Sequence, residues 1–223
     1  LTTYYYGRSG LREMLGRFGR IRVGLQWWLV LLFLPAAVHL VGRSLWQLMG
    51  PGELDLQLWF SVSTVLTSVL IPGLGEELGW RGFALPRLQA LFSPLTASVL
   101  LAGVHFFWHL PTYWLGQGIH NVPLVYAVGF MVPWTLIYTW VYNRSGGSLL
   151  FAVGFHAISN TSLSVVRFMP LDAEVPISPD LITQVSLPTE YSGPYLSVVA
   201  VYWVVALIVE GTGGLTPANT DTP

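Results

Sequence analysis

Long apolar stretches, interrupted by short polar segments, set the pattern of this 223-residue chain. No Asp, Glu, Lys or Arg occurs in the 56 positions from Leu88 to Asn143. Other uncharged runs are Val23–Gly42, Leu56–Gly75, Ser145–Val166 and Tyr191–Val209. Because about 20 apolar residues suffice for a helix to cross a bilayer, the pattern predicts an all-α fold, a polytopic transmembrane helix bundle.

The apolar runs predict about six spans in one domain. The expected spans are Val23–Val41, Leu56–Leu70, Pro94–Leu110, Val122–Tyr142, Ser148–Val166 and Pro194–Val209. Pro72 and Gly73 are expected to break the chain after the second span. Residues 1–22 form a basic juxtamembrane segment in this interpretation, residues 23–209 the transmembrane domain, and residues 210–223 a disordered polar tail.

Composition supports the membrane interpretation and excludes several kinds of chemistry. Charged residues make up 9% of the chain, against about 25% in a soluble domain. The chain has no Cys, which excludes disulfides and a cysteine nucleophile, and all ten of its basic residues are Arg, which excludes lysine chemistry. A formal net charge of −1 gives no support for binding of nucleic acid.

The distribution of arginine predicts the orientation in the bilayer, since cytoplasmic loops are enriched in basic residues. With the N-terminus inside, the inner segments hold Arg8, Arg12, Arg17, Arg20, Arg22, Arg81, Arg87 and Arg144. The outer segments then hold only Arg43 and Arg167. We therefore expect a multi-pass protein, in a bacterial plasma membrane, with both termini cytoplasmic.

The first polar group within the apolar sequence is the Glu-Glu-x-x-x-Arg stretch of Glu76, Glu77 and Arg81. On a helix, Glu77 and Arg81 share a face and can form an ion pair. Glu76 points about 100° away from Glu77. One carboxylate can therefore be held by arginine while the other faces elsewhere.

Two further polar pairs lie within expected spans, each with a spacing of four residues. They are His105 with His109, and His156 with Asn160. Ionisable residues inside a membrane are costly and are by default candidates for a functional site, although His105 and Asn160 could also serve only as hydrogen-bonding contacts between helices. The other histidines, His39 near a span end and His120 in a loop, are expected to be interfacial or solvated.

A carboxylate and an imidazole that share one water can act as a general base for hydrolysis. Imidazole and carboxamide donors on another helix could stabilise the oxyanion formed when that water attacks an amide. No serine lies in a specific nucleophile motif, which favours direct attack by water. The same side chains could instead ligate a divalent metal such as zinc, through Glu76, His109 and His156, with His105 as a further donor.

These motifs resemble those of the CAAX-protease/bacteriocin-processing (Abi) family of intramembrane peptidases, which includes the type II CAAX prenyl endopeptidases. The first family motif is Glu-Glu-x-x-x-Arg, the second is Phe-x-x-x-His, matched at its end by His109, and the third is His-x-x-x-Asn or Asp, matched by His156 and Asn160. The similar region covers residues 72–164, the expected peptidase-like core.

The resemblance implies that Glu76 and His109 activate the water, that His156 and Asn160 form the oxyanion site, and that Arg81 orients the glutamate pair. It also implies a peptide or lipidated-peptide substrate, such as a prenylated CAAX-type terminus or a bacteriocin, reached from the lipid bilayer. In this interpretation no cofactor is required, and a divalent metal such as zinc stays the alternative. His105 departs from the motif, because it stands where Phe is usual. Family members also usually carry more spans upstream, and we expect helices to be missing there.

Two questions stay open at this level. Straight helices with these span ends would separate Glu76 from His109 by about 15 Å or more, so that Gly73, Gly75 and Gly79 would have to let the glutamate segment enter the bilayer beside a cavity open to the cytoplasm. The second question is whether the protein is an enzyme at all, because it could instead be a non-catalytic membrane scaffold or a bacteriocin self-immunity protein. A transporter is disfavoured, since no half of the chain repeats the other.

Overall fold

The computed structural model describes residues 2–49, 62–114, 122–165 and 189–217, and within them all regular structure is helical, which confirms the all-α prediction. The helices are α1 (Thr2–Gly16), η1 (Arg17–Gly19), α2 (Leu25–Met49), α3 (Val62–Ser68), η2 (Val69–Glu76), α4 (Glu77–Gly79), η3 (Trp80–Ala84), α5 (Leu85–Gln89), α6 (Pro94–Trp114), α7 (Leu124–Arg144), α8 (Leu149–Val165) and α9 (Thr189–Gly211).

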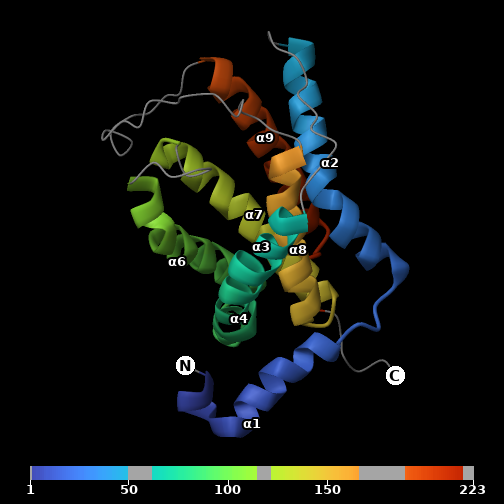
Figure 1. The fold of residues 1–223 in the computed structure, drawn as a ribbon, viewed down its shortest axis with the longest axis vertical. Helices are drawn as coiled ribbons and strands as arrows, with labels where there is room; N and C mark the ends of the chain where they lie inside the picture. The colour runs from blue at the N-terminus through green and yellow to red at the C-terminus, as the bar shows by residue number, and fades with distance from the viewer. Residues whose placement is uncertain (1, 50–61, 115–121, 166–188, 218–223) are drawn as a thin grey trace.

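Four long helices, α2, α7, α8 and α9, make the centre of the bundle (Figure 1). Helix α2 packs against α8 and α9, and α7 packs against α6 and α9. Their facing surfaces share one apolar cluster that includes Val38, Tyr138, Phe155 and Tyr202. At Gly42, a Cβ atom would lie 2.5 Å from the Cα of Val198, so the absent side chain allows α2 to approach α9 closely.

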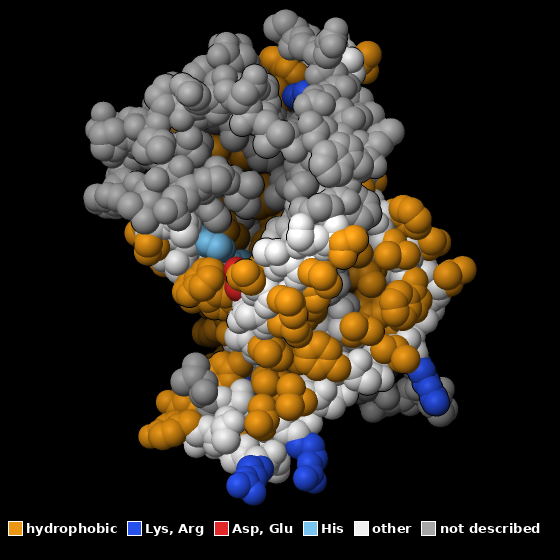
Figure 2. Space-filling model, viewed as in Figure 1, with side chains coloured by type: hydrophobic (Ala, Val, Ile, Leu, Met, Phe, Trp, Pro, Cys, Tyr) orange, Lys and Arg blue, Asp and Glu red, His pale blue; other side chains and the backbone are white. Residues whose placement is uncertain are grey.

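Three of the described helices are long and apolar enough to cross a bilayer: α2, α7 and the Ser192–Gly211 part of α9. Helices also occupy the other three expected spans, in α3 with η2, in α6 and in α8. On the face shown in the space-filling view, apolar side chains cover the described middle of the molecule, and arginine side chains lie at its lower end and near its top (Figure 2). This is the surface expected of an integral membrane protein.

The predicted break at Pro72 and Gly73 is wrong. The chain stays helical from Val62 to Gln89, because two π-helical segments, η2 and η3, accommodate the residues that would end an α-helix. π-Helical turns within helices occur frequently at functional sites, and here they hold Glu76 and Arg81. The glutamates therefore lie inside a continuous helical stretch rather than at the end of a span.

This continuous stretch and α6 form an antiparallel hairpin. The turn lies at residues 90–93, where the Ser93 hydroxyl accepts a hydrogen bond from the backbone N–H of Thr96 and Pro94 begins α6. Glu76 and His109 lie at similar distances, about 20 Å at 1.5 Å per residue, from this turn. The hairpin brings them side by side, and the expected separation of about 15 Å or more is wrong because the helix does not end at Pro72.

Gly73 sets the distance between this stretch and α8. A Cβ atom there would lie 3.1 Å from the Val153 Cγ1 atom, 3.3 Å from the Val153 carbonyl oxygen and 3.0 Å from the Ser68 carbonyl oxygen. The corresponding position at Gly79 has no atom within 4 Å, and Gly75 has only the Leu70 oxygen at 4.0 Å. Of the three glycines singled out in the sequence, only Gly73 is needed for a close approach.

The turn between α7 and α8 is short because two glycines adopt the left-handed conformation. Gly146 has φ 66° and Gly147 has φ 73°, values that are costly for other residues. The backbone N–H of Gly147 donates to the Tyr142 carbonyl oxygen at 2.8 Å. The turn aligns α8, which carries His156, antiparallel to α7.

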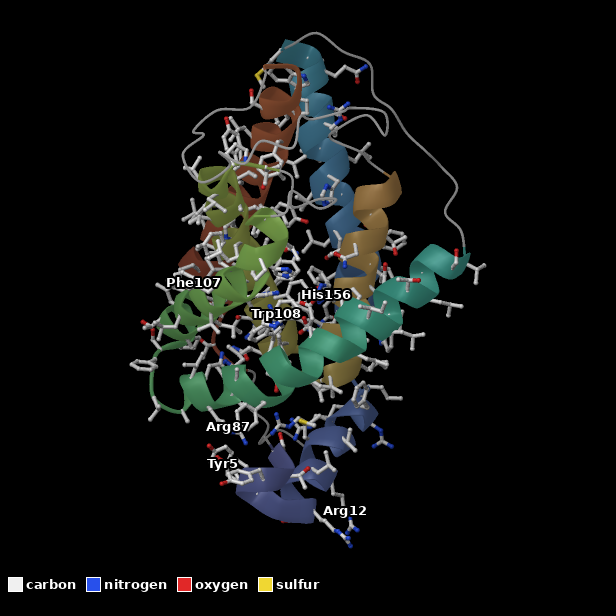
Figure 3. All side chains as sticks on the ribbon, turned by 60° about the vertical axis from the view of Figure 1, so that its left-hand side comes forward. Tyr5, Arg12, Arg87, Phe107, Trp108 and His156 are labelled. Carbon is white, nitrogen blue, oxygen red and sulfur yellow. The ribbon has the colours of Figure 1, made fainter. Side chains whose placement is uncertain are left out.

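The basic segment lies across one end of the bundle (Figure 3). Met14 of α1 is buried, and the Arg17 guanidinium donates to the Tyr142 hydroxyl of α7 at 3.1 Å. Arg12 and Tyr5 are exposed. Residues 2–19 therefore dock on the helix bundle through one face and leave aromatic and basic side chains on the other.

The structure differs from the expected disordered tail over residues 210–217. Leu215 is buried, and its carbonyl oxygen accepts a hydrogen bond of 2.6 Å from the Asn143 side chain of α7. The backbone N–H of Gly214 donates to Val209 at 2.7 Å. Residues 218–223 lie outside the described residues, as do His120 and Arg167.

Candidate active site

Glu76 and Glu77 leave the same helical stretch in different directions, as their spacing predicts. The Glu77 carboxylate is fully buried and accepts hydrogen bonds of 2.9 Å and 3.2 Å from Nη1 of Arg81. Its Oε1 atom also lies 2.8 Å from Nδ1 of His156 on α8. The predicted pairing of Glu77 with Arg81 is thus present, and His156 joins it.

Aromatic rings enclose this ion pair. The Arg81 guanidinium lies 4.2 Å from the ring centre of Tyr138 and 5.6 Å from that of Trp134, both on α7. The Arg81 side chain has no exposed surface, so it is not one of the cytoplasmic arginines with which we predicted the orientation. Cation–π contacts and the carboxylate together compensate its charge in the bundle interior.

The Glu76 carboxylate faces α6 instead. Its Oε2 atom lies 3.1 Å from Nε2 of His105 and 3.9 Å from Nε2 of His109, and the two imidazoles stack with ring centres 4.9 Å apart. The indole N–H of Trp80 donates to the same oxygen at 3.4 Å. The side chains of Glu76 and His109 keep 12% and 16% of their surface exposed, which leaves both accessible to a small molecule.

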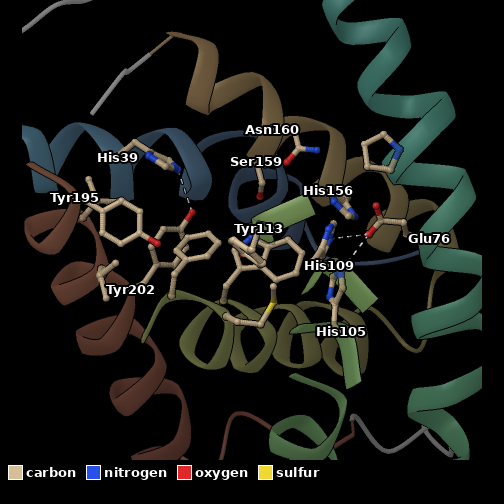
Figure 4. A pocket seen from close by; sticks show the side chains of 16 residues that line it. His39, Glu76, His105, His109, Tyr113, His156, Ser159, Asn160, Tyr195 and Tyr202 are labelled. Carbon is tan, nitrogen blue, oxygen red and sulfur yellow. Dashed lines mark hydrogen bonds and ion pairs between the residues drawn. The ribbon is translucent and has the colours of Figure 1, made fainter. Parts of the chain in front are cut away.

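A cavity of about 190 Å³ connects the Glu76 cluster with the interior of the bundle (Figure 4). Glu76, His105 and His109 lie together at one end, and His39, Tyr195 and Tyr202 lie at the other. The wall between them includes Tyr113, Met131, Trp134, His156, Ser159 and Asn160. In the space-filling view, an acidic and a histidine side chain reach the surface next to each other (Figure 2).

The structure therefore brings all of the predicted site residues to one region, although in two groups. Glu76, His105, His109, His156 and Asn160 line the cavity. Glu77 and Arg81 lie behind it, where Glu77 contacts His156 and Arg81 holds Glu77. His105, whose role the sequence left open, is a direct partner of Glu76.

The prediction for His39 is wrong. Only 1% of His39 is exposed, and its Nε2 atom lies 3.2 Å from the Tyr202 hydroxyl oxygen of α9. Helix α2 continues to Met49, beyond the predicted span end at Val41, which moves His39 into the interior. Sequence reasoning also missed Trp80, although its spacing of four residues from Glu76 placed both on one helix face.

The arrangement can activate a water molecule. One water oxygen can bridge the 3.9 Å gap between Glu76 Oε2 and His109 Nε2 with hydrogen bonds of about 2.8 Å to each. The same end of the cavity can hold a metal, because the donor atoms of Glu76, His105 and His109 lie within 4.8 Å of one another. The three residues whose donor atoms lie close together are thus Glu76, His105 and His109, with His105 in the place of the predicted ligand His156.

Together, fold and site define a polytopic integral membrane protein with a carboxylate–imidazole site inside its helix bundle. Residues 57–162 match the family model of type II CAAX prenyl endopeptidases described as Rce1-like. Over these residues the chain is similar to this family, in agreement with the resemblance of its motifs. It is similar to CAAX prenyl protease 2 of Methanococcus maripaludis, with 33% identity over 112 residues, 45% of this chain and 41% of that relative. The chain thus spans less than half the length of this relative.

Proposed function

We propose that this protein is an intramembrane endopeptidase that hydrolyses a peptide bond with a water activated by Glu76 and His109. The observation that carries the proposal is the separation of two adjacent glutamates. Glu77 is held in a fully buried ion pair, whereas Glu76 faces the cavity beside two imidazoles. The family match and the name of the archaeal relative support peptide hydrolysis as the reaction.

In the proposed mechanism, Glu76 accepts a proton from the water as the water oxygen attacks the carbonyl carbon of the substrate. His109 holds the water in line by a hydrogen bond. Glu76 then delivers the proton to the leaving nitrogen as the carbon–nitrogen bond breaks. His105, 3.1 Å from the same carboxylate oxygen, positions Glu76 for both steps.

The negative charge on the carbonyl oxygen is stabilised by Asn160 and His156 in this proposal. The amide of Asn160 can donate a hydrogen bond in any protonation state. His156 already uses Nδ1 toward the acceptor Glu77, so its other nitrogen donates only when the ring carries a second proton. Arg81 acts through Glu77 and positions His156 rather than touching the substrate.

The proposed substrate is a peptide segment that enters from the lipid bilayer, either a prenylated CAAX-type terminus or a bacteriocin-like or other membrane peptide. The archaeal relative is named a CAAX prenyl protease, which favours the first. We propose a bacterial plasma membrane as the location, with both termini and the cavity mouth on the cytoplasmic side. No metal is required in this mechanism.

The test is hydrolysis of fluorogenic peptides, one with a prenylated CAAX-type terminus and a set of unmodified membrane peptides, by purified protein in lipid vesicles. We expect Glu76→Gln to lower the rate by about 10²–10⁴-fold, the usual contribution of a general base. Glu13→Gln, which removes an exposed carboxylate on α1, is the matched control and should keep the rate. Activity should survive a chelator.

Two results would contradict the proposal. If Glu76→Gln hydrolyses the peptides at the wild-type rate, Glu76 is not the base. If folded wild-type protein cleaves no peptide, the scaffold or immunity hypothesis replaces it.

A further inference from the structure

The end of the cavity at Glu76 carries three donor atoms that converge on one point. Glu76, His105 and His109 each offer one ligand atom, and these three atoms all lie within 4.8 Å of one another. Figure 4 shows the three side chains turned toward each other from two helices. One carboxylate and two imidazoles form a ligand set that zinc uses in proteins.

The distances fit a tetrahedral metal after a small movement. With bonds of about 2.0–2.2 Å, ligand atoms around zinc are roughly 3.3 Å apart. The present separations are 3.1 Å from Glu76 Oε2 to His105 Nε2 and 3.9 Å from Glu76 Oε2 to His109 Nε2, and all three ligand atoms lie within 4.8 Å of one another. Two histidines four residues apart on one helix are a known zinc-binding spacing, and α6 presents them with stacked rings at an interplanar angle of 29°.

The third donor, His105, is not part of the family motif that the sequence resembles. The motif has Phe where this chain has His105, and a chain with Phe there would offer only Glu76 and His109. His105 is 1% exposed, and its ring is fixed against Trp80 at 4.8 Å and Trp134 at 5.6 Å between ring centres. A donor so held loses little side-chain freedom when it binds a metal.

We propose that this protein binds one Zn²⁺ ion through Glu76, His105 and His109, and that the bound ion blocks peptide hydrolysis. The second part rests on the proposed function. The ion would take the carboxylate oxygen and the His109 nitrogen that otherwise hold the water. Zinc hydrolases combine three ligands with a separate base. Among the described residues that line this cavity, Glu76 is the only carboxylate, and Glu77 is held by Arg81 and His156.

The binding part is tested by equilibrium dialysis of detergent-solubilised protein against Zn²⁺, with the bound metal measured by atomic absorption. Wild-type protein should retain one zinc per chain. His105→Phe should bind at least about 100-fold more weakly, more than a lost second-shell partner costs. His39→Phe is the matched control, because it removes another buried histidine that lines the same cavity, and it should bind as the wild type does.

Unfolding temperatures of all three proteins, without metal, show whether each variant is folded. Zinc should raise the unfolding temperature of the wild type and of His39→Phe, but not that of His105→Phe. Folded wild-type protein that binds no zinc, or binding that is unchanged in His105→Phe, would overturn the proposal. This part needs no substrate, so it stands or fails separately from the proposed function.

The inhibitory part compares the rate of peptide hydrolysis with and without zinc. The rate with zinc divided by the rate without zinc should be one tenth or less for the wild type, and chelator should bring it back to one. For His105→Phe this ratio should stay near one, at whatever rate that variant retains. A wild-type rate that rises with zinc, or that ignores zinc at saturating occupancy, would overturn the inhibitory assignment. Absence of hydrolysis in metal-free wild type would instead contradict the proposed function.

Discussion

The carboxylates of Glu76 and Glu77 leave one helical stretch a single residue apart and end in different environments. Glu77 has no exposed surface and is bonded to Arg81 and His156. Glu76 faces a cavity, and its nearest partners are two imidazoles and an indole. In a bundle interior, a carboxylate with a full set of partners is a structural element, whereas one beside a cavity is available for chemistry.

Exposure, rather than spacing, makes the difference between ion pairs in this chain. Glu13 and Arg17 have the same four-residue spacing as Glu77 and Arg81, with a closest N–O distance of 3.1 Å against 2.9 Å. The Glu13 side chain is 69% exposed, and the Glu77 side chain is 0% exposed. The two pairs allow the contribution of burial to be measured at nearly constant geometry.

The largest effect on stability is expected when the buried pair loses its cation. Arg81→Ala leaves the Glu77 carboxylate without its arginine in the interior, which should cost about 3–5 kcal/mol. Unfolding in detergent, followed by circular dichroism, measures this cost. The control is Arg87→Ala, which removes an arginine stacked on Tyr6 and Phe83 near the surface. Equal losses in both variants would show that Arg81 is not the centre of a buried network.

A smaller loss is expected where η2 packs on α8. Gly73→Ala places a methyl group 3.1 Å from the Val153 Cγ1 atom, and we expect a cost of about 1–3 kcal/mol, with a lower hydrolysis rate as His156 moves from Glu77. Gly79→Ala adds its methyl group where no atom lies within 4 Å and should gain up to about 1 kcal/mol. Thermal unfolding of the two variants decides this, and a Gly73→Ala protein as stable as Gly79→Ala would show that the contact is not tight.

The aromatic face beneath Arg81 is expected to contribute less. Tyr138→Leu removes a ring whose centre lies 4.2 Å from the guanidinium carbon, and the cation–π part of the loss should be about 0.5–2 kcal/mol. Tyr138→Phe keeps the ring and serves as the control. The difference in unfolding free energy between the two variants measures how much the aromatic ring at position 138 contributes to stability. If Arg81→Ala reduces that difference, the ring and the guanidinium are coupled.

The smallest effect is expected at the exposed pair. Glu13→Gln should change the free energy of unfolding by less than about 1 kcal/mol, because solvent screens the interaction. Raising the salt concentration should remove even that difference. A loss as large as that of Arg81→Ala, measured in the same denaturant titration, would contradict the comparison.

Much of this arrangement could be read from the sequence. The uncharged runs gave the helical membrane class, and the four-residue spacings gave the Glu77–Arg81 pair and placed His105 with His109 on one face. The contact of Glu76 with His105 and His109 could not be derived, because it depends on where the hairpin between the two helices turns. Pro72 and Gly73 were expected to break the chain after the second span, but π-helical segments carry the helix through to Gln89.

The environments of single histidines were harder to predict. His39 lay close to an expected span end, and only the extra length of α2 shows that it is buried beside Tyr202. His105 lies among apolar residues in the sequence, and the family motif has Phe at its position. Its contacts with Glu76 and Trp80 appear only once the fold places α6 beside them. Local patterns fix which residues share a helix face, whereas packing fixes which face another helix meets.

The division between the two glutamates is tested most directly by the free energy of unfolding of Glu76→Gln and Glu77→Gln, measured side by side in one detergent. Glu77→Gln removes the charge that Arg81 and His156 share and should lose about 3–5 kcal/mol. Glu76→Gln keeps a cavity-facing polar side chain and should stay within about 1 kcal/mol of the wild type. Equal losses in the two variants, or a larger loss in Glu76→Gln, would contradict the assignment of Glu77 to structure and Glu76 to chemistry.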